Sequence, residues 1–118
     1  MTKIQNSTYD LEDRTLRFAQ NVSSYIGSLP KNITNLEYTK QLARSSGSVG
    51  ANYIEANESL GKKDFLLHIK ISRKEAKESR YWLLLTAATG NAEHVKAELV
   101  KESTELMKIF GAILLKST

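Results

Sequence analysis

Apolar and small side chains recur at alternating steps of three and four residues in four separate segments of the chain. This heptad spacing places the side chains of each segment on one face of a helix, and four such faces pack together in a bundle. Only one proline and six glycines interrupt the 118 residues, which favours long helices over many short strands. The spacing predicts helices over residues 9–28, 35–59, 63–88 and 92–116.

Residues that end or begin helices lie between these segments. Pro30 ends the first helix, because the residue before a proline avoids helical geometry. Thr34 to Glu37 reads as a capping box, Gly61 and Gly90 as stops, and Asn91 as an N-cap. Because the connections are short, neighbouring helices run antiparallel. The sequence therefore predicts one all-α domain spanning the 118 residues, an antiparallel up-down-up-down four-helix bundle.

The core line of the second predicted helix is unusual. This helix carries Gly47 and Gly50 in mid-helix, where a glycine costs about 1 kcal/mol relative to alanine. Close approach of a neighbouring helix is the reason we favour, because the frame of a phosphate-cradling loop is absent. The fourth helix has a predicted core line of six residues: Val95, Leu99, Glu102, Leu106, Ile109 and Ile113.

One segment, which begins just before the third helix, carries all of the excess positive charge. Residues 62–80 hold seven bases and three acids, which equals the net charge of +4 of the whole chain. On a helical wheel the seven bases share one flank: Lys62, Lys63, Lys70, Arg73, Lys74, Lys77 and Arg80. The three acids lie on the opposite flank. The flank is either a solvated face with pairs such as Lys74–Glu78, or a nucleic-acid-binding stripe. Tyr81 is its only aromatic neighbour, which argues against base-specific recognition of single strands.

Apolar side chains outside the core lines of the third and fourth helices predict self-association. A helix that is covered on one side needs a narrower apolar stripe than these two have, and large exposed apolar patches usually mark interfaces. The predicted interface residues are Ile71, Trp82, Leu85, Phe110 and Leu114.

Polar side chains on the second helix form a stripe beside its core line, at Arg44, Ser45, Ser48, Asn52 and Glu55. We favour a hydrogen-bonded network between helices or subunits, because buried polar groups normally satisfy one another. The alternative is a polar pocket, in which Asn52 and Glu55 would serve an enzyme.

The motifs of the common enzyme and metal sites are absent. The chain has no cysteine, no Glu-x-x-His and no HExxH. His68 and His94 are on separate helices and are not spaced as the ligands of one metal ion. The sequence therefore predicts no metal, no cofactor and no enzymatic activity. It also lacks the apolar run of a signal peptide and any stretch of about 20 apolar residues. We expect a cytoplasmic protein without a membrane partner.

Four segments read together carry a family resemblance: Tyr9–Thr15, Gln41–Ala56, Lys63–Phe65 and Lys74–Leu83. In these segments the chain resembles the bacterial four-helix-bundle proteins named after the 23S rRNA intervening sequences. The resemblance implies an up-down-up-down bundle and a ring-shaped homopentamer. It also implies kinship with the accessory variability determinant of diversity-generating retroelements, a pentameric barrel with a basic surface that binds a reverse transcriptase and nucleic acid.

These observations lead to two hypotheses about function. The first is a homo-oligomeric, pentameric, non-enzymatic accessory protein that binds RNA or DNA through the basic flank. The alternative is a protein-binding scaffold, for an acidic partner or a reverse transcriptase, without direct contact to nucleic acid.

Overall fold

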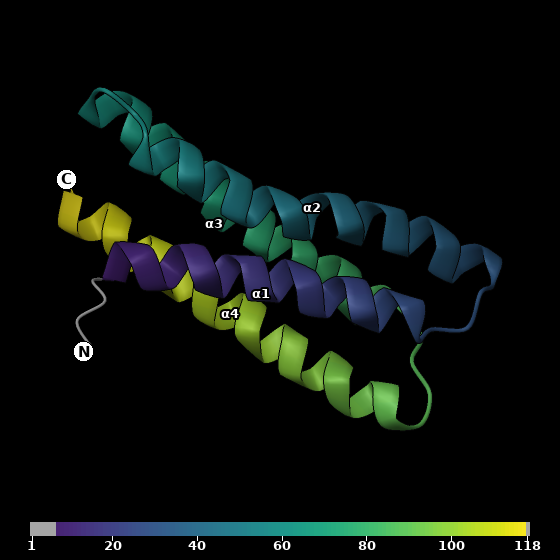
Figure 1. The fold of residues 1–118 in the computed structure, drawn as a ribbon. Coiled ribbons are helices and arrows are strands. Elements are labelled where there is room, and N and C mark those ends of the chain that lie inside the picture. Colours follow the sequence, from purple (N-terminus) through teal and green to yellow (C-terminus); the bar gives the residue numbers. More distant parts are fainter. Residues whose placement is uncertain (1–6, 118) are drawn as a thin grey trace.

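The computed structural model describes residues 7–117, with side chains from residue 11 onward. Four helices run in sequence, α1 (Ser7–Gly27), α2 (Ile33–Asn57), α3 (Lys62–Leu85) and α4 (Asn91–Ser117). Each helix runs antiparallel to the one before it, which confirms the predicted up-down-up-down bundle (Figure 1). The helices α2 and α3 pack closely, as do α3 and α4, whereas α1 and α4 have the sparsest contact of the neighbouring pairs. None of the helices in the described part is long and apolar enough to cross a membrane.

The heptad spacing predicts core lines from Leu11 to Leu29, from Leu42 to Ala56 and from Phe65 to Leu83, and these lie inside the bundle except for the half-buried Phe65. Phe18, Val22, Leu42, Val49 and Ile69 are at most 1% exposed. Burial of each such side chain stabilises the fold by about 1.5–3 kcal/mol, so this shared core holds the four helices together.

The predicted core line of α4 is only partly correct. Leu99 and Leu106 are buried as expected, but Val95, Glu102, Ile109 and Ile113 are only half-buried. The other buried residues of α4 are Ser103, Phe110 and Leu114. Because α4 packs on α3 much more extensively than on α1, the helix is rotated toward α3.

The small residues of α2 have two different environments. A Cβ atom added to Gly50 would lie 2.9 Å from Thr15 Oγ1, so this glycine permits the close approach of α1 that we predicted. A Cβ atom added to Gly47 would meet nothing within 4 Å, so the same prediction is wrong for Gly47 within one chain. Ser45 and Ser79 share a hydrogen bond of 2.8 Å where α2 meets α3.

The capping residue of α2 is not the predicted one. Asn32, and not Thr34, is the N-cap, and its Oδ1 accepts a hydrogen bond of 2.9 Å from the backbone N–H of Asn35. Asn32 has the extended backbone (φ −115°, ψ 173°) that an N-cap requires. Gly61 proves to be the N-cap of α3, and Asn91 is the first residue of α4 rather than its N-cap.

The helix α3 ends at Leu85, three residues earlier than predicted. The amide of Asn35 donates to Ala87 O at 3.0 Å and accepts from Ala87 N at 2.9 Å, as a neighbouring strand would. The hydroxyl groups of Tyr25 and Thr86 share a buried hydrogen bond of 2.7 Å, and burial raises the pKa of Tyr25. Contacts from two other helices therefore hold this segment extended, with φ −67° and ψ 145° at Thr86.

Candidate nucleic-acid interface

A cleft of about 670 Å³ runs between α3 and α4 and gathers most of the predicted basic residues. Its lining is Lys70, Arg73, Lys74 and Lys77 from α3 and Thr104, Met107 and Lys108 from α4. We call these seven residues the basic cleft. Five of the seven are cations and none is a carboxylate, so the cleft is suited to an anionic ligand.

Arg80 adjoins the basic cleft, whereas Lys62 lies apart from it. Arg80 Nε donates a hydrogen bond of 3.0 Å to Thr104 Oγ1, which lines the cleft. Lys62 lines a separate hollow at the end of the bundle, together with Lys116. Lys63 is exposed, near the start of α3. The structure thus joins five of the seven predicted bases, Lys70, Arg73, Lys74, Lys77 and Arg80, and leaves two outside.

The charge pattern of α3 alone does not reveal that Lys108 and Thr104 line the same cleft. Both residues belong to α4, and nothing in the sequence sets the register in which α4 lies against α3. Lys108 is exposed and Thr104 is half-buried. The structure adds these residues because the two helices pack along most of their lengths.

Two of the three acids of α3, Glu75 and Glu78, contact α2, away from the basic cleft. Arg44 Nη1 lies 3.4 Å from Glu75 Oε1, and the same guanidinium pairs with Glu78. Its hydrogen bond to Glu78 is the main cause that raises the pKa of Arg44. Burial alone would raise the pKa of Glu78, but hydrogen bonds from Trp82 and Arg44 lower it.

Because Glu78 pairs with Arg44, it does not form the expected ion pair with Lys74. Within the described residues, none of the seven predicted bases has a carboxylate oxygen within 4 Å. No contact ion pair therefore neutralises these bases, and a polyanion would displace the solvent ions around them.

The predicted polar network exists as two separate clusters. Arg44 belongs to the cluster with Glu75 and Glu78 just described. In the other, Asn52 Nδ2 donates to Ser48 Oγ at 3.0 Å, and Asn52 Oδ1 lies 3.1 Å from His68 Nδ1. Glu55 is exposed and joins neither cluster. These contacts satisfy polar groups between α2 and α3.

The part of the chain with described side chains contains no group of three acids or histidines that could hold a metal ion.

Two of the predicted interface residues lie in the core of the chain. Phe110 is 0% exposed and packs against Tyr53 with ring centroids 5.9 Å apart, so its predicted role between subunits is wrong. Leu114 is also buried in this core. The cause is the rotation of α4 toward α3, which turns this side of α4 inward.

The other three predicted interface residues keep some exposure. Leu85 is 40% exposed, whereas Ile71 is half-buried. Trp82 stacks on Tyr38 at 6.1 Å between ring centroids and donates a hydrogen bond of 2.9 Å to Glu78 Oε2. Trp82 therefore has a role inside the chain, in the contact between α2 and α3.

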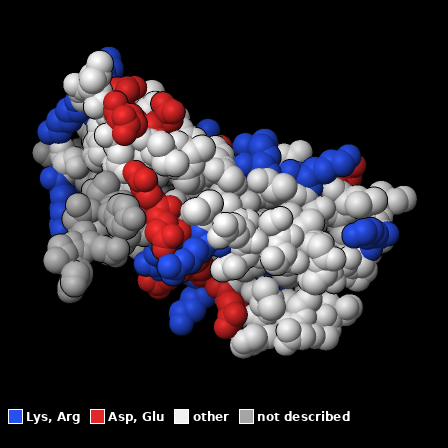
Figure 2. Space-filling model, viewed as in Figure 1, with Lys and Arg blue, Asp and Glu red and all other residues white. Residues whose placement is uncertain are grey.

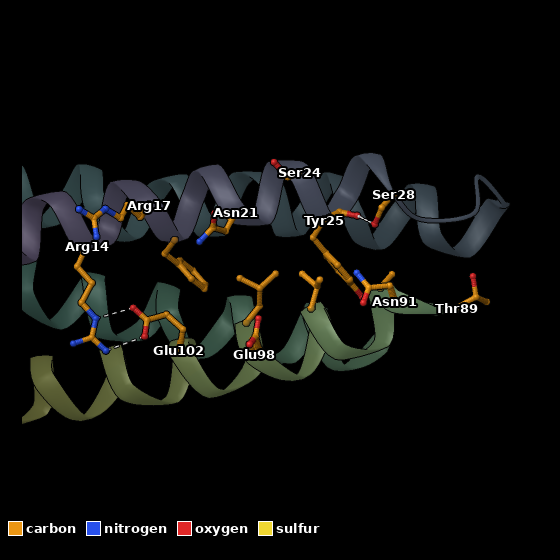
Figure 3. Close-up of a pocket in the computed structure, with 14 residues that line it drawn as sticks. Arg14, Arg17, Asn21, Ser24, Tyr25, Ser28, Thr89, Asn91, Glu98 and Glu102 are labelled. Atoms are coloured by element: carbon orange, nitrogen blue, oxygen red, sulfur yellow. Dashed lines mark hydrogen bonds and ion pairs between the residues drawn. The ribbon is translucent and has the colours of Figure 1, made fainter.

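A second hollow, of about 900 Å³, separates α1 from α4 (Figure 3). Phe18, Tyr25 and Leu99 supply buried apolar surface to it. At one end Arg14 forms two hydrogen bonds, of 2.7 and 2.8 Å, with Glu102, and this contact is the main cause that raises the pKa of Arg14. The sequence did not predict this hollow, because it depends on how far α1 and α4 stand apart.

The charged side chains around this second hollow are paired within the chain. Arg17 lies 2.7 Å from Asp13, and His94 lies 3.2 Å from Glu98. The surface over the C-terminal part of α1 and the N-terminal part of α4, at the right in Figure 2, is mostly uncharged. The pairing of these side chains contrasts with the unpaired cations of the basic cleft.

Comparison with known proteins places this fold in a family. Residues 8–112 match the family of 23S rRNA-intervening sequence proteins. The fold is similar to the crystal structure of a protein of unknown function, from the S23 ribosomal protein family, of Bacteroides thetaiotaomicron. The two are 27% identical with a TM-score of 0.72, over 87% of this chain and 96% of that one. A comparison with curated proteins gave no match. The chain therefore belongs to the 23S rRNA-intervening sequence protein family.

Proposed function

We propose that this chain is a non-enzymatic accessory protein that assembles into a homopentamer and binds nucleic acid through the basic cleft. The observation that supports binding is the absence of any carboxylate among the seven residues that line the cleft. Lys70, Lys74, Lys77 and Lys108 there are all exposed, so a phosphate backbone can reach them. Neutralised phosphates release counterions, and this release drives sequence-independent binding.

Assembly would multiply a weak interaction. Five copies would carry a net charge of +20, five times the +4 of one chain. Sites joined in one particle bind a long polyanion much more tightly than any single site does. The pentamer itself is what the family resemblance implies, and the exposed apolar residues of α3 support self-association. Leu67 is 52% exposed and Leu85 is 40% exposed on this helix.

Charge reversal in α3 tests the proposed binding. A variant with Arg73→Glu, Lys77→Glu and Arg80→Glu should lose affinity for a labelled RNA or DNA at least a hundredfold at about 0.1 M salt, because three phosphate contacts become repulsive. Fluorescence anisotropy measures the affinity, and circular dichroism checks that the bundle stays helical. The wild-type affinity should also fall steeply as salt rises.

A matched control reverses three bases elsewhere. Arg17→Glu, Lys31→Glu and Lys40→Glu change the net charge equally, at exposed positions outside the basic cleft. This control should keep most of the affinity. Equal binding by the α3 variant and the wild type would exclude the basic cleft as the binding surface.

A protein-binding scaffold is the second candidate function. The same unpaired cations would accept the carboxylates of an acidic protein or of a reverse transcriptase. Capture of partners from a bacterial lysate, with and without nuclease treatment, separates the two candidates. A partner that remains bound after nuclease treatment supports the scaffold, whereas loss of every partner supports direct binding of nucleic acid.

A further inference from the structure

Two arginines of α3, Arg73 and Arg80, lie against α4, and Lys74 and Lys77 of the basic cleft come between them in the chain. We propose that Arg73 and Arg80 hold backbone phosphates of a nucleic acid and that the cleft reads no bases. This inference rests on the proposed function and specifies its chemistry. The ligand is the phosphodiester backbone, which DNA and RNA share.

Arg80 is held in place by α4. Its Nε donates to Thr104 Oγ1 at 3.0 Å, and that hydroxyl donates in turn to Val100 O at 3.0 Å. The hydroxyl is thus fixed as an acceptor for the guanidinium. The hydrogen bond uses only one of the five N–H groups of Arg80, so the two terminal nitrogens remain available to a ligand. A guanidinium that is oriented in advance loses little entropy when it binds phosphate.

Arg73 lies over Gly111 of α4. A Cβ atom added to Gly111 would be 3.8 Å from Arg73 Nη1 and 4.0 Å from its Cδ. The arginine stem therefore crosses α4 where that helix has no side chain. In the part of the chain with described side chains, no carboxylate pairs with this guanidinium. The N–H groups of its planar guanidinium remain free to bind an anion.

The two arginines are one heptad apart on α3. Seven residues of helix give an axial separation of about 10.5 Å, with both side chains on the side that faces α4. Lysines at positions 70, 74 and 77 lie between and beside them and are exposed. We assign attraction of the polyanion to the flexible lysines and its fixed contacts to the two arginines.

Groups that stack on bases or read adenine are missing from the cleft. Its lining contains no aromatic residue, asparagine or glutamine. The nearest aromatic residue along α3, Tyr81, packs edge-on against Trp82 with centroids 5.1 Å apart. Trp82 in turn stacks on Tyr38 of α2. Base stacking and adenine readout therefore have no suitable partner here.

In a duplex, arginine can also read guanine where it enters the major groove. That groove is about 12 Å wide and admits one helix. The cleft has helices on both sides, each about 10 Å across with its side chains. Two packed helices do not fit into the groove, so these arginines meet the backbone.

Charge-conserving variants test the proposal. The double variant Arg73→Lys and Arg80→Lys keeps the net charge but loses the planar donors, whereas Lys31→Arg and Lys40→Arg, at exposed positions outside the basic cleft, is the matched control. Probes are labelled 20-nucleotide oligo(dA), oligo(dT) and oligo(U), and a mixed-sequence duplex, measured by anisotropy. The arginine-to-lysine variant should bind each probe roughly tenfold more weakly, with an unchanged salt dependence, and the control should not be weakened.

The same probes test the absence of base reading. Oligo(dA), oligo(dT) and oligo(U) should bind the wild type within about threefold of one another, and inorganic polyphosphate should displace all of them. Equal binding by Arg73→Lys/Arg80→Lys and the wild type, or strong preference for one base, would overturn this proposal while leaving nucleic-acid binding intact. If the wild type bound none of the probes, both the inference and the proposed function would be wrong.

Discussion

Thr15 limits how closely α1 can approach α2. Its hydroxyl donates to Leu11 O at 2.9 Å, and its side chain lies directly opposite Gly50. A β-branched side chain held in this way cannot easily rotate aside. The two mid-helix glycines of α2 therefore differ in their physical role, although they look alike in the sequence.

Substitution of each glycine by alanine should have opposite effects on stability. Gly47→Ala adds a methyl group in open space and should stabilise the fold by about 1 kcal/mol, the difference in helix propensity. Gly50→Ala places its Cβ atom 2.9 Å from Thr15 Oγ1 and should destabilise the fold by about 1–3 kcal/mol. Urea unfolding followed by circular dichroism measures both. Stabilisation by both substitutions would show that α1 moves aside easily.

At the residue scale the sequence predicted which side chains of α3 carry charge, but not which of them are neutralised. The pairing of Arg44 with Glu75 and Glu78 depends on the register between α2 and α3. A helical wheel treats each helix alone, so it offered Lys74 as the partner of Glu78. In the structure Glu78 pairs with Arg44 of α2 instead, so Lys74 forms no ion pair among the residues described.

At the scale of elements, the end of α3 at Leu85 is not explained by the helix propensity of the residues that follow. Residues 86–88 are good enough helix formers to extend the predicted helix, and the next glycine is Gly90. Tertiary contacts from Asn35 and Tyr25 hold the backbone extended instead. Asn35 is only 2% exposed, so its amide is committed to this contact.

Removal of the Asn35 amide should therefore weaken the bundle more than an ordinary polar substitution does. Asn35→Ala leaves the N–H and C=O groups of Ala87 without their partner, and we expect a loss of about 1–3 kcal/mol in the free energy of unfolding. Asn21→Ala, at an exposed position of α1, is the control and should change stability by less than about 0.5 kcal/mol. Equal effects of the two substitutions would mean that solvent replaces the Asn35 contact at no cost.

The rotation of α4 has the same kind of origin. The wide apolar arc of α4 offers two neighbouring lines of residues that could face the core. The line predicted from the sequence shares only Leu99 and Leu106 with the line that is buried. Phe110 enters the core because α3 covers α4 much more fully than α1 does. A pattern fixes the existence of a helix more firmly than its rotation about its own axis.

The whole molecule separates its charged and its apolar surfaces. The bases of the basic cleft lie toward α4, Glu75 and Glu78 lie toward α2, and exposed leucines of α3 remain uncovered in one chain. The fold class was predictable because four uninterrupted periodic segments allow few other arrangements. The α3–α4 cleft and the α1–α4 hollow were not, because both are formed by pairs of helices.

Exposed leucines provide a test of assembly that leaves the core intact. Leu67→Asp with Leu85→Asp should dissociate the proposed oligomer to the 13.2 kDa chain, because it places charge in an apolar contact. Trp82 is a poorer probe, since its contact with Tyr38 belongs to the fold. Leu16→Asp, at a position 54% exposed on α1, is the control and should leave the oligomer unchanged. Light scattering measures the mass, and a monomeric wild type would exclude the assembly.

The sparse contact between α1 and α4 has a consequence for the motions of the backbone. The helix α3 is covered by α2 on one side and by α4 on the other, whereas α1 packs well only against α2. Local opening is easiest where few side chains are buried between elements. Amide protons of α1 should therefore exchange with deuterated solvent sooner than those of α3, and α1 should be the first helix to detach as the bundle unfolds.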